Sequence, residues 1–289
     1  MELLDGKFAS QKVIDTLKLE TSKLISQNKR VPHLVAILIG DNAASQVYVK
    51  SKVNSCNEIG FHSTLITKDS SCSEKELLDM ITHYAQDKNI DGILVQLPLP
   101  NHINATKIIE SIPPEKDVDG FHSINIGKIC LGMDGFISAT PLGIILLLEE
   151  YKISVASKNI VIVGRSHIVG RPLSILLSSS HPNYGNGTVT LCHSKTKNLS
   201  SFTRQADILI ACIGKPYFIK QDMVQKDAVV IDVGINRIEI EGKKKLVGDV
   251  DFDKVAPLCS YITPVPGGVG KMTIAALMKN TFLAYNLKK

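Results

Sequence analysis

The sequence of 289 residues lacks the features of a membrane or exported protein. No stretch approaches the roughly 18 consecutive apolar residues that a membrane-spanning helix needs. The first residues, M-E-L-L-D-G-K, do not have the layout of a signal peptide. We therefore expect a soluble, cytoplasmic protein with no membrane partner.

Metal-site and disulfide patterns are missing as well. The six cysteines lie far apart with no C-x-x-C pair, and the eight histidines have neither H-x-x-x-H nor H-x-H spacing. Disulfides are rare in an intracellular setting, and these spacings are not those of a zinc site. We expect most cysteines to be small buried residues and predict no bound metal.

The sequence also lacks a strong excess of one charge. The formal net charge of +5 is modest, and no run of lysine or arginine marks a nucleic-acid-binding face. The short run Lys243–Lys245 is more simply interpreted as a hairpin turn, so we expect no nucleic-acid partner. With 44% apolar residues the chain can bury real cores, and its length fits two α/β domains.

What the sequence does contain is a strand, a glycine turn and a helix within residues 159–178. Ile160–Val163 is an unbroken apolar run that ends at Gly164, as expected of a strand buried on both faces of a parallel sheet. Pro172 suits a first helical turn. Such a unit presents backbone N–H groups and a helix dipole to a phosphate. The helix itself is predicted from apolar residues at helical spacing, namely Ile168, Leu173, Leu176 and Leu177.

The glycines of this turn depart from the usual dinucleotide pattern G-x-G-x-x-G. Ser166 occupies the place of the middle glycine, and Gly170 comes late. The pattern favours a dinucleotide site but leaves open an α/β turn that binds no ligand.

The first half of the chain alternates strands with helices. Gly60 is placed to end one helix, and Ser73 with Glu76 forms the S-x-x-E pattern of a capping box. The order β-α-β-α-β implies a parallel sheet with right-handed crossovers. The predicted strands are Val35–Ile39, His62–Thr67 and Ile93–Val95, and the predicted helices are Ala9–Gln27, Ala43–Glu58 and Ser73–Gln86.

The second half continues in the same way after a segment of different texture. Residues 113–135 are rich in glycine and polar side chains, and we interpret them as lining a cleft between domains. Pro141 suits the first turn of a helix over Thr140–Tyr151. Further predicted elements are strands at Thr188–Cys192, Asp207–Cys212, Ala228–Val233 and Tyr261–Val265, a hairpin of Ile238–Ile240 with Lys245–Val247 joined by Glu241-Gly242, and a helix at Met272–Leu287.

These elements predict an α/β fold of two lobes with parallel sheets. The second lobe would be a Rossmann-like dinucleotide-binding domain, and the cleft between the lobes would hold a substrate against a cofactor. We expect the first domain over residues 1–140, the second over 141–271, and a C-terminal helix over 272–289 that returns to the first domain.

The end of the strand at Thr188–Cys192 bears on the choice of cofactor. A dinucleotide-binding domain usually carries an acid there, which accepts hydrogen bonds from the adenosine ribose. This chain instead has His193, Ser194 and Lys195, and Arg165 could add a charged donor from the glycine turn. A hydroxyl and cations favour a 2′-phosphate and therefore NADP, although His193 and Lys195 could also be solvated loop residues.

The segment Val265–Thr273 imitates a P-loop without matching it. Val265 stands where the first glycine belongs, and Met272 stands where Ser or Thr belongs, so a nucleotide triphosphatase is disfavoured. The glycines in between still offer backbone N–H donors close to a planar ligand.

A possible catalytic group lies on the helix after the first predicted strand. Ser45, Tyr48 and Lys52 are spaced i, i+3 and i+7, so they share one face near the carboxyl ends of the parallel strands. Tyr48 could stack on a flat ring, and a partly desolvated lysine can lose its proton near neutral pH. A solvated surface face is the alternative. Gln96, Asp117 and Asp119 raise the odds of a site because they are predicted to converge on the same place.

Five ordered motifs together resemble the methylenetetrahydrofolate dehydrogenase/cyclohydrolase family over essentially the whole chain. They are Y-V-K-S-K (Tyr48–Lys52), V-Q-L-P-L-P (Val95–Pro100), P-P-E-K-D-V-D-G (Pro113–Gly120), V-G-R-S-H-I-V-G-R-P (Val163–Pro172) and P-V-P-G-G-V-G (Pro264–Gly270).

The resemblance implies the roles of the site residues. Tyr48 would pack on the pterin and aminobenzoate of folate, Lys52 would be the catalytic cation or base, Gln96 would assist Lys52, and Asp119 would bind the pterin edge. The remaining folate contacts would come from Ser45, Val95, Leu97, Pro266, Gly267, Gly268, Val269 and Gly270. The NADP site would be lined by Gly164, Arg165, Ser166, Ser194 and Ile235.

The implied activity is oxidation of 5,10-methylenetetrahydrofolate with NADP, followed by hydrolysis of the methenyl product to 10-formyltetrahydrofolate, in a homodimer formed through the second lobes. Two residues depart from the family pattern: Ala139 replaces a cysteine before Thr140-Pro141, and Lys271 replaces the proline after Gly270. Alternatives are another two-lobed NADP-dependent dehydrogenase, of shikimate or amino-acid type, and a dinucleotide-binding module without turnover.

Overall fold

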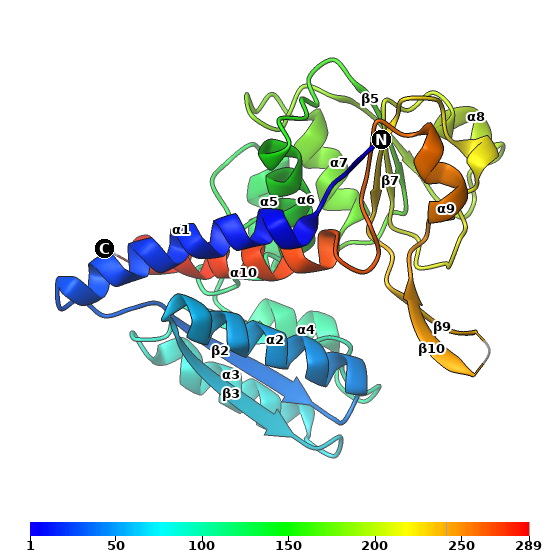
Figure 1. Ribbon diagram of the computed structural model, residues 1–289. Helices are drawn as coiled ribbons and strands as arrows, with labels where there is room; N and C mark the ends of the chain where they lie inside the picture. The colour runs from blue at the N-terminus through cyan, green and yellow to red at the C-terminus, as the bar shows by residue number, and fades with distance from the viewer. Residues whose placement is uncertain (241, 289) are drawn as a thin grey trace. The chain divides into compact units, whose positions relative to one another are not determined.

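The computed structural model describes residues 1–240 and 242–288, and these form two compact units (Figure 1). The first unit comprises Met1–Ser10, Ile129–Met133 and Thr140–Thr273. The second comprises Gln11–Lys128, Asp134–Ala139 and Ile274–Lys289. Each unit has its own parallel sheet, which confirms the predicted α/β class.

The sheet of the second unit has three parallel strands in the order β3-β2-β4. The strands are β2 (His33–Ile39), β3 (His62–Lys68) and β4 (Gly92–Val95). From β2 the chain moves to β3 on one side and then to β4 on the other. The carboxyl ends of β2 and β4 therefore form a topological switch point, the place where open α/β sheets bind ligands.

Helices cover both faces of this sheet. Alternate residues of β2 join the core under α3 (Glu74–Gln86) and α4 (Ala105–Ser111), while α2 (Ala43–Ile59) contacts β2 and β3. The prediction did not include α4. The core on the α3 side contains Val35, Ile37, Ile39, Leu77, Ile81, Ile93 and Ile108.

The predicted signals at Gly60 and at Ser73 with Glu76 are confirmed. Gly60 ends α2 in the left-handed conformation with φ of 89°, and at the start of this helix Asn42, which was not predicted as a cap, accepts the N–H groups of Ala44 and Ser45. At α3 the hydroxyl of Ser73 and the carboxylate of Glu76 form the expected capping box. These local signals set the helix boundaries because they satisfy otherwise unpaired backbone groups.

Two long helices begin three residues earlier than predicted. They are α1 (Gly6–Ser26) and α10 (Val269–Asn286), and in both cases a glycine lies in the first turn. Residues 274–289 of the chain belong to the same unit as α2, where the side chain of Cys56 contacts Met278. The segment between residues 113 and 135 contains a helix that was not predicted, α5 (Ser123–Cys130).

The sheet of the first unit has six parallel strands in the order β1-β11-β8-β7-β5-β6. From β5 the chain moves to β6 on one side and to β7 on the other, so this sheet also has a switch point, beside β5. This is the arrangement of a Rossmann-like domain. The strands are β1 (Glu2–Leu3), β5 (Asn159–Val163), β6 (Thr188–Cys192), β7 (Ile208–Ala211), β8 (Val229–Asp232) and β11 (Tyr261–Ile262).

The helices of the first unit include α6 (Ala139–Glu150) and α7 (Gly170–Ser178), with the shorter α8 (Leu199–Thr203) and α9 (Phe252–Val255) and the single 3-10 turns η1 (Gln221–Met223) and η2 (Ala256–Leu258). A core of apolar side chains from β5, β7 and β8 packs under the η1 and α9 segments. Close packing of α6 requires Gly143, because a Cβ there would lie 2.8 Å from the carbonyl carbon of Met272.

Three sequence predictions for this unit need correction. Ile168 is exposed in the turn before α7, because that helix begins only at Gly170. The predicted strand Tyr261–Val265 ends at Ile262, since the following prolines cannot donate to a ladder. Lys243–Lys245 lie in strand β10 (Lys243–Val247) and not in a turn.

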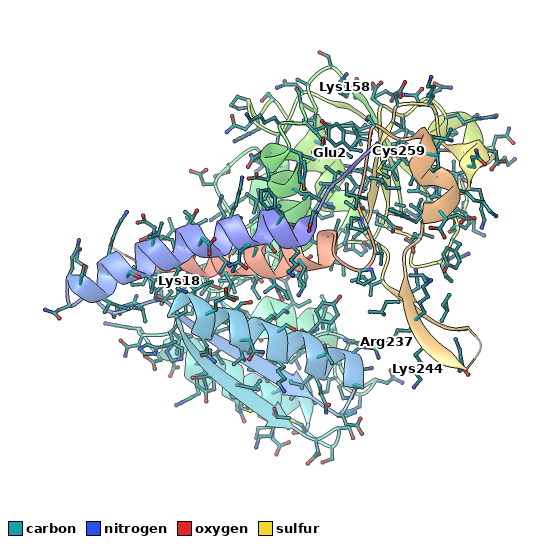
Figure 2. All side chains as sticks on the ribbon, in the orientation of Figure 1. Glu2, Lys18, Lys158, Arg237, Lys244 and Cys259 are labelled. Carbon is teal, nitrogen blue, oxygen red and sulfur yellow. The ribbon has the colours of Figure 1, made fainter. Side chains whose placement is uncertain are left out.

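The predicted hairpin itself is confirmed. β9 (Asn236–Ile240) pairs with β10 in antiparallel register, and the pair projects from the rest of its unit with Arg237 and Lys244 on it (Figure 2). Glu241, predicted to be in the turn, lies outside the described residues. None of the helices over residues 1–240 and 242–288 is long and apolar enough to cross a membrane.

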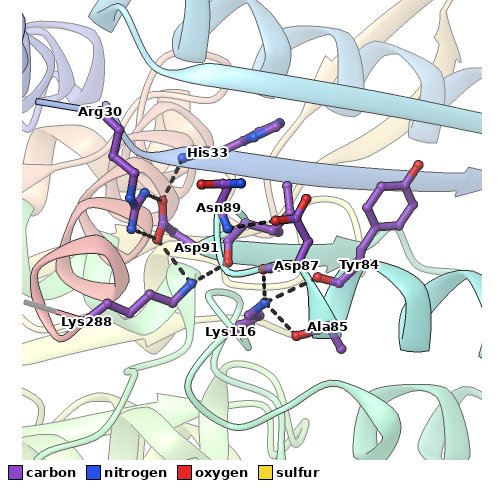
Figure 3. Close-up of polar contacts among 10 residues, drawn as sticks. Arg30, His33, Tyr84, Ala85, Asp87, Asn89, Asp91, Lys116 and Lys288 are labelled. Carbon is purple, nitrogen blue, oxygen red and sulfur yellow. Dashed lines mark hydrogen bonds and ion pairs between the residues drawn. The ribbon is translucent and has the colours of Figure 1, made fainter.

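Charged side chains hold the amino ends of β2 and β4. Asp91, fully buried just before β4, accepts hydrogen bonds from both terminal nitrogens of Arg30 at 2.7 and 2.9 Å and from the backbone N–H of His33 at 3.0 Å (Figure 3). Lys288 Nζ lies 3.2 Å from the same carboxylate. Two cations and a backbone donor compensate the buried charge, and they tie the end of the chain to the edge of the sheet.

A buried cation at this end of the sheet, Lys116, caps the end of α3. Lys116 Nζ donates to the carbonyl oxygens of Tyr84, Ala85 and Asp87 at 3.2, 2.7 and 2.7 Å (Figure 3). These carbonyls lack helical partners at the end of α3, so a cation there is favoured by hydrogen bonding and by the helix dipole. The charged side chains at the amino edge of the sheet therefore stabilise the fold.

Candidate active site

The buried face of α2 carries the predicted lysine. Ser45 and Lys52 are buried, with Lys52 only 7% exposed, and Tyr48 is partly exposed beside them. Lys50, two positions away, is exposed. Fully buried lysines are rare unless they are paired, so the interpretation of this face as a solvated surface is wrong for Lys52.

Gln96 is the hydrogen-bonding partner of Lys52. It follows β4 directly, and its backbone N–H donates to the carbonyl of Ile37 in β2 at 2.9 Å. Lys52 Nζ donates to Gln96 Oε1 at 3.0 Å, and Gln96 Nε2 donates to the carbonyl of Leu97 at 2.7 Å. The amide is thereby oriented with its oxygen toward the lysine, at the switch point of the sheet. Val95 is the buried last residue of β4.

Asp119 approaches the same lysine from the segment after α4. Asp117 pairs with Ile93 in an isolated parallel bridge, which places this segment beside β4. Gly120 then turns with φ of 69°, and a Cβ there would lie 2.7 Å from the carbonyl oxygen of Phe136. The turn after Asp119 therefore requires glycine.

The electrostatics of the site follow from burial. Desolvation lowers the pKa of Lys52, and the charge of Asp119 partly opposes that shift. Burial likewise raises the pKa of Asp119, against the influence of Lys52. Both shifts favour the neutral forms, so Lys52 can exchange a proton at a pH where an exposed lysine stays charged. A lysine held in this way can act as a general base.

Asp117, with two asparagines that the sequence interpretation missed, Asn125 and Asn280, holds the Asp119 segment in place. The Asp117 carboxylate accepts from the backbone N–H of His122 at 2.8 Å and from Asn125 Nδ2 at 2.9 Å. Asn280, buried in α10, donates from Nδ2 to the carbonyls of Val118 and Ile137 at 2.8 and 2.9 Å. An asparagine within an apolar helix is the sequence signal that could have indicated such a contact.

The glycine turn of the first unit explains its unusual spacing. Gly164 has φ of 134°, and a Cβ there would overlap the carbonyl of Cys212 after β7. A Cβ at Gly170 would overlap the carbonyl of Gly164. The late glycine thus lets α7 approach the turn closely. Ser166 Oγ accepts from the N–H of Val169 at 3.2 Å, so the side chain in the place of a glycine orders the turn.

The sheet register places the predicted 2′-phosphate residues at one edge. Val163 pairs with Cys192, and Arg165 and Ser194 each follow two residues beyond this pair. Both are exposed, as is Lys195. The N–H of Lys195 donates to His193 Nδ1 at 3.2 Å, so His193 contributes to the shape of this loop.

One residue of the predicted glycine-rich segment, Gly270, lies beside Ile235. A Cβ at Gly270 would lie 3.2 Å from Ile235 Cδ1. Gly268 packs against Gly6 of α1 so closely that Gly6 has no room for a Cβ, and the N–H of Lys7 donates to the carbonyl of Gly267 at 3.1 Å. Lys271, which departs from the family pattern, is exposed in the first turn of α10.

The residues present fit a dinucleotide. Gly164 and Gly170 allow close packing around the turn after β5, because a Cβ at either would overlap backbone atoms. The exposed Arg165 and Lys195 make one edge of the site basic, and Ser194 adds an exposed hydroxyl there. No carboxylate occupies the position after β6 where a 2′-phosphate would be repelled. Over residues 1–240 and 242–288 no group of three or more His, Cys, Asp or Glu side chains could hold a metal ion.

The predicted site residues therefore fall into two sets. In the second unit the structure brings Lys52, Gln96 and Asp119 together at the carboxyl edge of the three-stranded sheet. In the first unit Gly164, Arg165, Ser166, Ser194 and Ile235 follow the strands of the Rossmann-like sheet, with Pro266, Gly267, Gly268, Val269 and Gly270 after β11. The fold and these residues define an α/β protein with a dinucleotide-binding unit and a buried lysine site.

Comparisons with known proteins identify the family. Residues 4–119 match the catalytic domain of tetrahydrofolate dehydrogenase/cyclohydrolase, and residues 138–289 match its NAD(P)-binding domain. The bifunctional protein FolD of Flavobacterium johnsoniae is 52% identical over 291 residues, covering 100% of this chain and 98% of that protein. The chain belongs to the tetrahydrofolate dehydrogenase/cyclohydrolase family.

Solved structures agree. The FolD enzyme of Campylobacter jejuni has a TM-score of 0.94 and 48% identity, covering all of both chains. The enzyme of Trypanosoma brucei, solved with NADP cofactor and an inhibitor, has a TM-score of 0.92 and 30% identity over 98% of this chain and 96% of that one. Full-length matches to both domains favour this family over other two-lobed dehydrogenases and over a module without turnover.

Replacing Gln96 by glutamate should raise the pKa of Lys52. A carboxylate would then stand where the amide oxygen lies 3.0 Å from Nζ, and an opposite charge stabilises the ammonium form. We expect the pH dependence of acetylation at Lys52, followed by mass spectrometry, to shift alkaline by about one unit or more. Exposed Lys50 is the internal control and should not change. An unchanged Lys52 profile would contradict the pairing.

Proposed function

We propose that the chain oxidises 5,10-methylenetetrahydrofolate with NADP and hydrolyses the methenyl product to 10-formyltetrahydrofolate, as a step of one-carbon metabolism. The observation that carries the proposal is the buried Lys52 bonded to Gln96, in a chain that matches both domains of the family over its length. A lysine with a lowered pKa supplies the proton transfer that hydrolysis needs.

The folate would bind at the carboxyl edge of the three-stranded sheet. Tyr48, partly exposed on α2 near Lys52, would stack on the flat rings, and Asp119 would accept hydrogen bonds from the pterin edge. Burial that raises the pKa of Asp119 also allows its protonated form to donate. The other proposed contacts are Ser45, Val95, Leu97 and the glycine-rich residues Pro266, Gly267, Gly268, Val269 and Gly270.

NADP would be held by the first unit. When bound, it supplies the nicotinamide ring that accepts a hydride. Gly164 and Ser166 would approach the pyrophosphate with backbone groups, and Ile235 would contact the ring end. Arg165 and Ser194 would bind the 2′-phosphate. Oxidation needs alignment of the substrate more than acid–base help, so positioning residues can support it without Lys52.

Hydrolysis makes a different demand. A water oxygen bonds to the methenyl carbon, and its proton must leave as the bond forms. Neutral Lys52 would accept that proton, with Gln96 holding Nζ in place. Lys52 would then give this proton to N5 of the pterin as the bond from that nitrogen to the carbon breaks. The hydroxyl that came from water would lose its remaining proton as its C=O bond forms, so the formyl group stays on N10 and one proton is released to solvent. The lowered pKa of Lys52 makes the neutral base available at a lower pH than for an exposed lysine.

Replacing Lys52 by glutamine should therefore separate the two activities. We expect cyclohydrolase activity to be lost, by about 100-fold or more because a general base contributes that much, while dehydrogenase activity remains measurable. Methenyltetrahydrofolate should accumulate, and both rates are to be measured on the same purified protein.

Lys50→Gln is the matched control, since Lys50 lies on the same helix but is exposed. It should keep both rates. If Lys52→Gln retains its cyclohydrolase rate, or if Lys50→Gln loses it instead, the base is assigned to the wrong residue. A wild-type protein without NADP-dependent dehydrogenase activity would contradict the proposed function as a whole.

Replacing Arg165 by alanine should weaken the binding of NADP far more than that of NAD. A charged hydrogen bond to the extra phosphate is worth roughly 1.5–3 kcal/mol, which corresponds to about 10- to 150-fold in affinity. Dissociation constants for both cofactors can be measured by calorimetry. Equal losses for the two would remove Arg165 from the 2′-phosphate site.

We further propose domain roles, location and assembly. Residues 1–140 would bind folate, residues 141–271 would bind NADP, and the helix over 272–289 would return to the folate-binding domain. The protein would act in the cytoplasm as a homodimer joined through the NADP-binding units, which the family resemblance supports. A sedimentation experiment that finds only the mass of a single 31.5 kDa chain at micromolar concentration would contradict the homodimer.

A further inference from the structure

A fully buried carboxylate lies at the carboxyl edge of the Rossmann-like sheet and has no part in the proposed chemistry. Asp249 is 0% exposed. Its Oδ2 accepts from the backbone N–H groups of Ile213 and Gly214 at 2.6 and 2.9 Å. Its Oδ1 accepts from the N–H of Lys215 and from Asn236 Nδ2, both at 2.9 Å. Four donors thus compensate one buried charge.

Three of these donors form a familiar kind of anion site. Successive backbone N–H groups that converge on one point make a concave nest, which in nucleotide-binding proteins usually receives a phosphate. Here the nest follows β7 and is filled by the protein's own carboxylate. The conformation of the loop over residues 213–215 is therefore fixed by an internal anion of the protein.

A second buried carboxylate supports the first. Asp232, at the end of β8, accepts from the N–H groups of Gly234, Asp249 and Val250, each at 2.9 Å. Burial raises the pKa of Asp232 to about 6. The two aspartates form a chain in which Asp232 holds the backbone of Asp249, and Asp249 in turn holds the loop after β7.

The packing around Asp232 and Asp249 leaves no room for a side chain at two neighbouring glycines. A Cβ at Gly234 would overlap the Asp249 carboxylate, and a Cβ at Gly248 would overlap the carboxylate of Asp232. The glycines in D-V-G and G-D-V thus have a physical role that their sequence context does not reveal. Both are required because a backbone segment passes directly over a carboxylate.

The loops held by Asp249 adjoin the dinucleotide-binding residues. Cys212, which precedes the nest, contacts Gly164 so closely that the latter has no room for a Cβ. Asn236, the side-chain donor, directly follows Ile235, which lies beside Gly270. One carboxylate therefore connects the glycine turn after β5 with the residue proposed to contact the nicotinamide end.

We propose that Asp249 is a positioning residue for the NADP site: its carboxylate sets the loops after β7 and β8 in the conformation that binds the dinucleotide. It contacts no substrate and acts through Ile213, Gly214, Lys215 and Asn236. The inference rests on the proposed use of NADP by this unit. Loss of Asp249 should impair the dehydrogenase and spare the cyclohydrolase, which is the reverse of the effect expected for Lys52→Gln. The reason is that hydrolysis of the methenyl bridge consumes no dinucleotide.

The test is Asp249→Asn, with both activities measured on the same purified protein. The side-chain amide keeps one acceptor oxygen but turns an NH2 group toward backbone N–H donors, so at least one of them loses its partner. We expect the KM for NADP to rise by about tenfold, in line with the loss of a hydrogen bond to a charged group. The KM for methylenetetrahydrofolate and the cyclohydrolase rate should stay within about twofold of wild type.

Asp251→Asn is the matched control, because Asp251 lies two residues further on and is paired with Lys220 and Lys254 nearer the surface. It should leave the KM for NADP unchanged. If Asp249→Asn does not fold, Asn236→Ala decides the question: it removes one donor from the carboxylate and should raise the KM for NADP by about threefold with the cyclohydrolase rate retained.

An unchanged KM for NADP in Asp249→Asn, or in Asn236→Ala where that variant has to decide, would overturn the inference. Equal losses of dehydrogenase and cyclohydrolase activity would also overturn it, since they would make Asp249 a residue of general stability. These outcomes differ from failure of the proposed function, which would appear as a wild-type protein without NADP-dependent dehydrogenase activity.

Discussion

The reversal of strand order in each parallel sheet is the constraint on which the functional residues depend. In one sheet the chain leaves β2 for β3 and returns to β4, and in the other it leaves β5 for β6 and returns to β7. Connections that diverge from a central strand leave its carboxyl end uncovered. Lys52 lies on the helix that follows β2, and Gln96 follows the neighbouring β4. Gly164 and Arg165 follow β5 directly, so both sets lie where side chains and backbone N–H groups can face a ligand.

The two edges then solve different electrostatic problems. At the carboxyl edge of the three-stranded sheet, Lys52 is buried and Asp119 is partly buried, and desolvation lowers the pKa of Lys52 and raises that of Asp119. At the amino edge of the same sheet, Asp91 is fully buried but is paired with Arg30 and Lys288. Pairing with opposite charges stabilises the buried Asp91 carboxylate, whereas desolvation of Lys52 favours its neutral form, which can accept a proton.

Much of this could be predicted from local signals. β6 has the predicted bounds, and Ser73 with Glu76 caps α3 as expected, because both depend on neighbours within a few residues. The burial of Lys52 could not be decided in that way. Its helix carries lysines at positions 50 and 52, and only the packing of α2 against the sheet makes one exposed and the other buried. The position of Ile168 could not be predicted locally either. Its apolar spacing is compatible with α7, but the helix begins only at Gly170, which packs closely against Gly164.

Asp249 marks the limit of such prediction, because its partners are backbone groups. Every residue but proline has an N–H, so the sequence of Ile213–Lys215 carries no sign that three of them face a carboxylate. The same fact explains why an internal anion suits this edge. A loop that presents converging N–H groups to a phosphate is costly to hold open when no phosphate is bound. Filling one nest with a carboxylate keeps that loop in place beside the glycine turn after β5. The buried aspartates and the glycine turn therefore have complementary roles. The backbone N–H groups of Ile213–Lys215 are paired with Asp249, whereas those of the glycine turn after β5 are proposed to bind the cofactor.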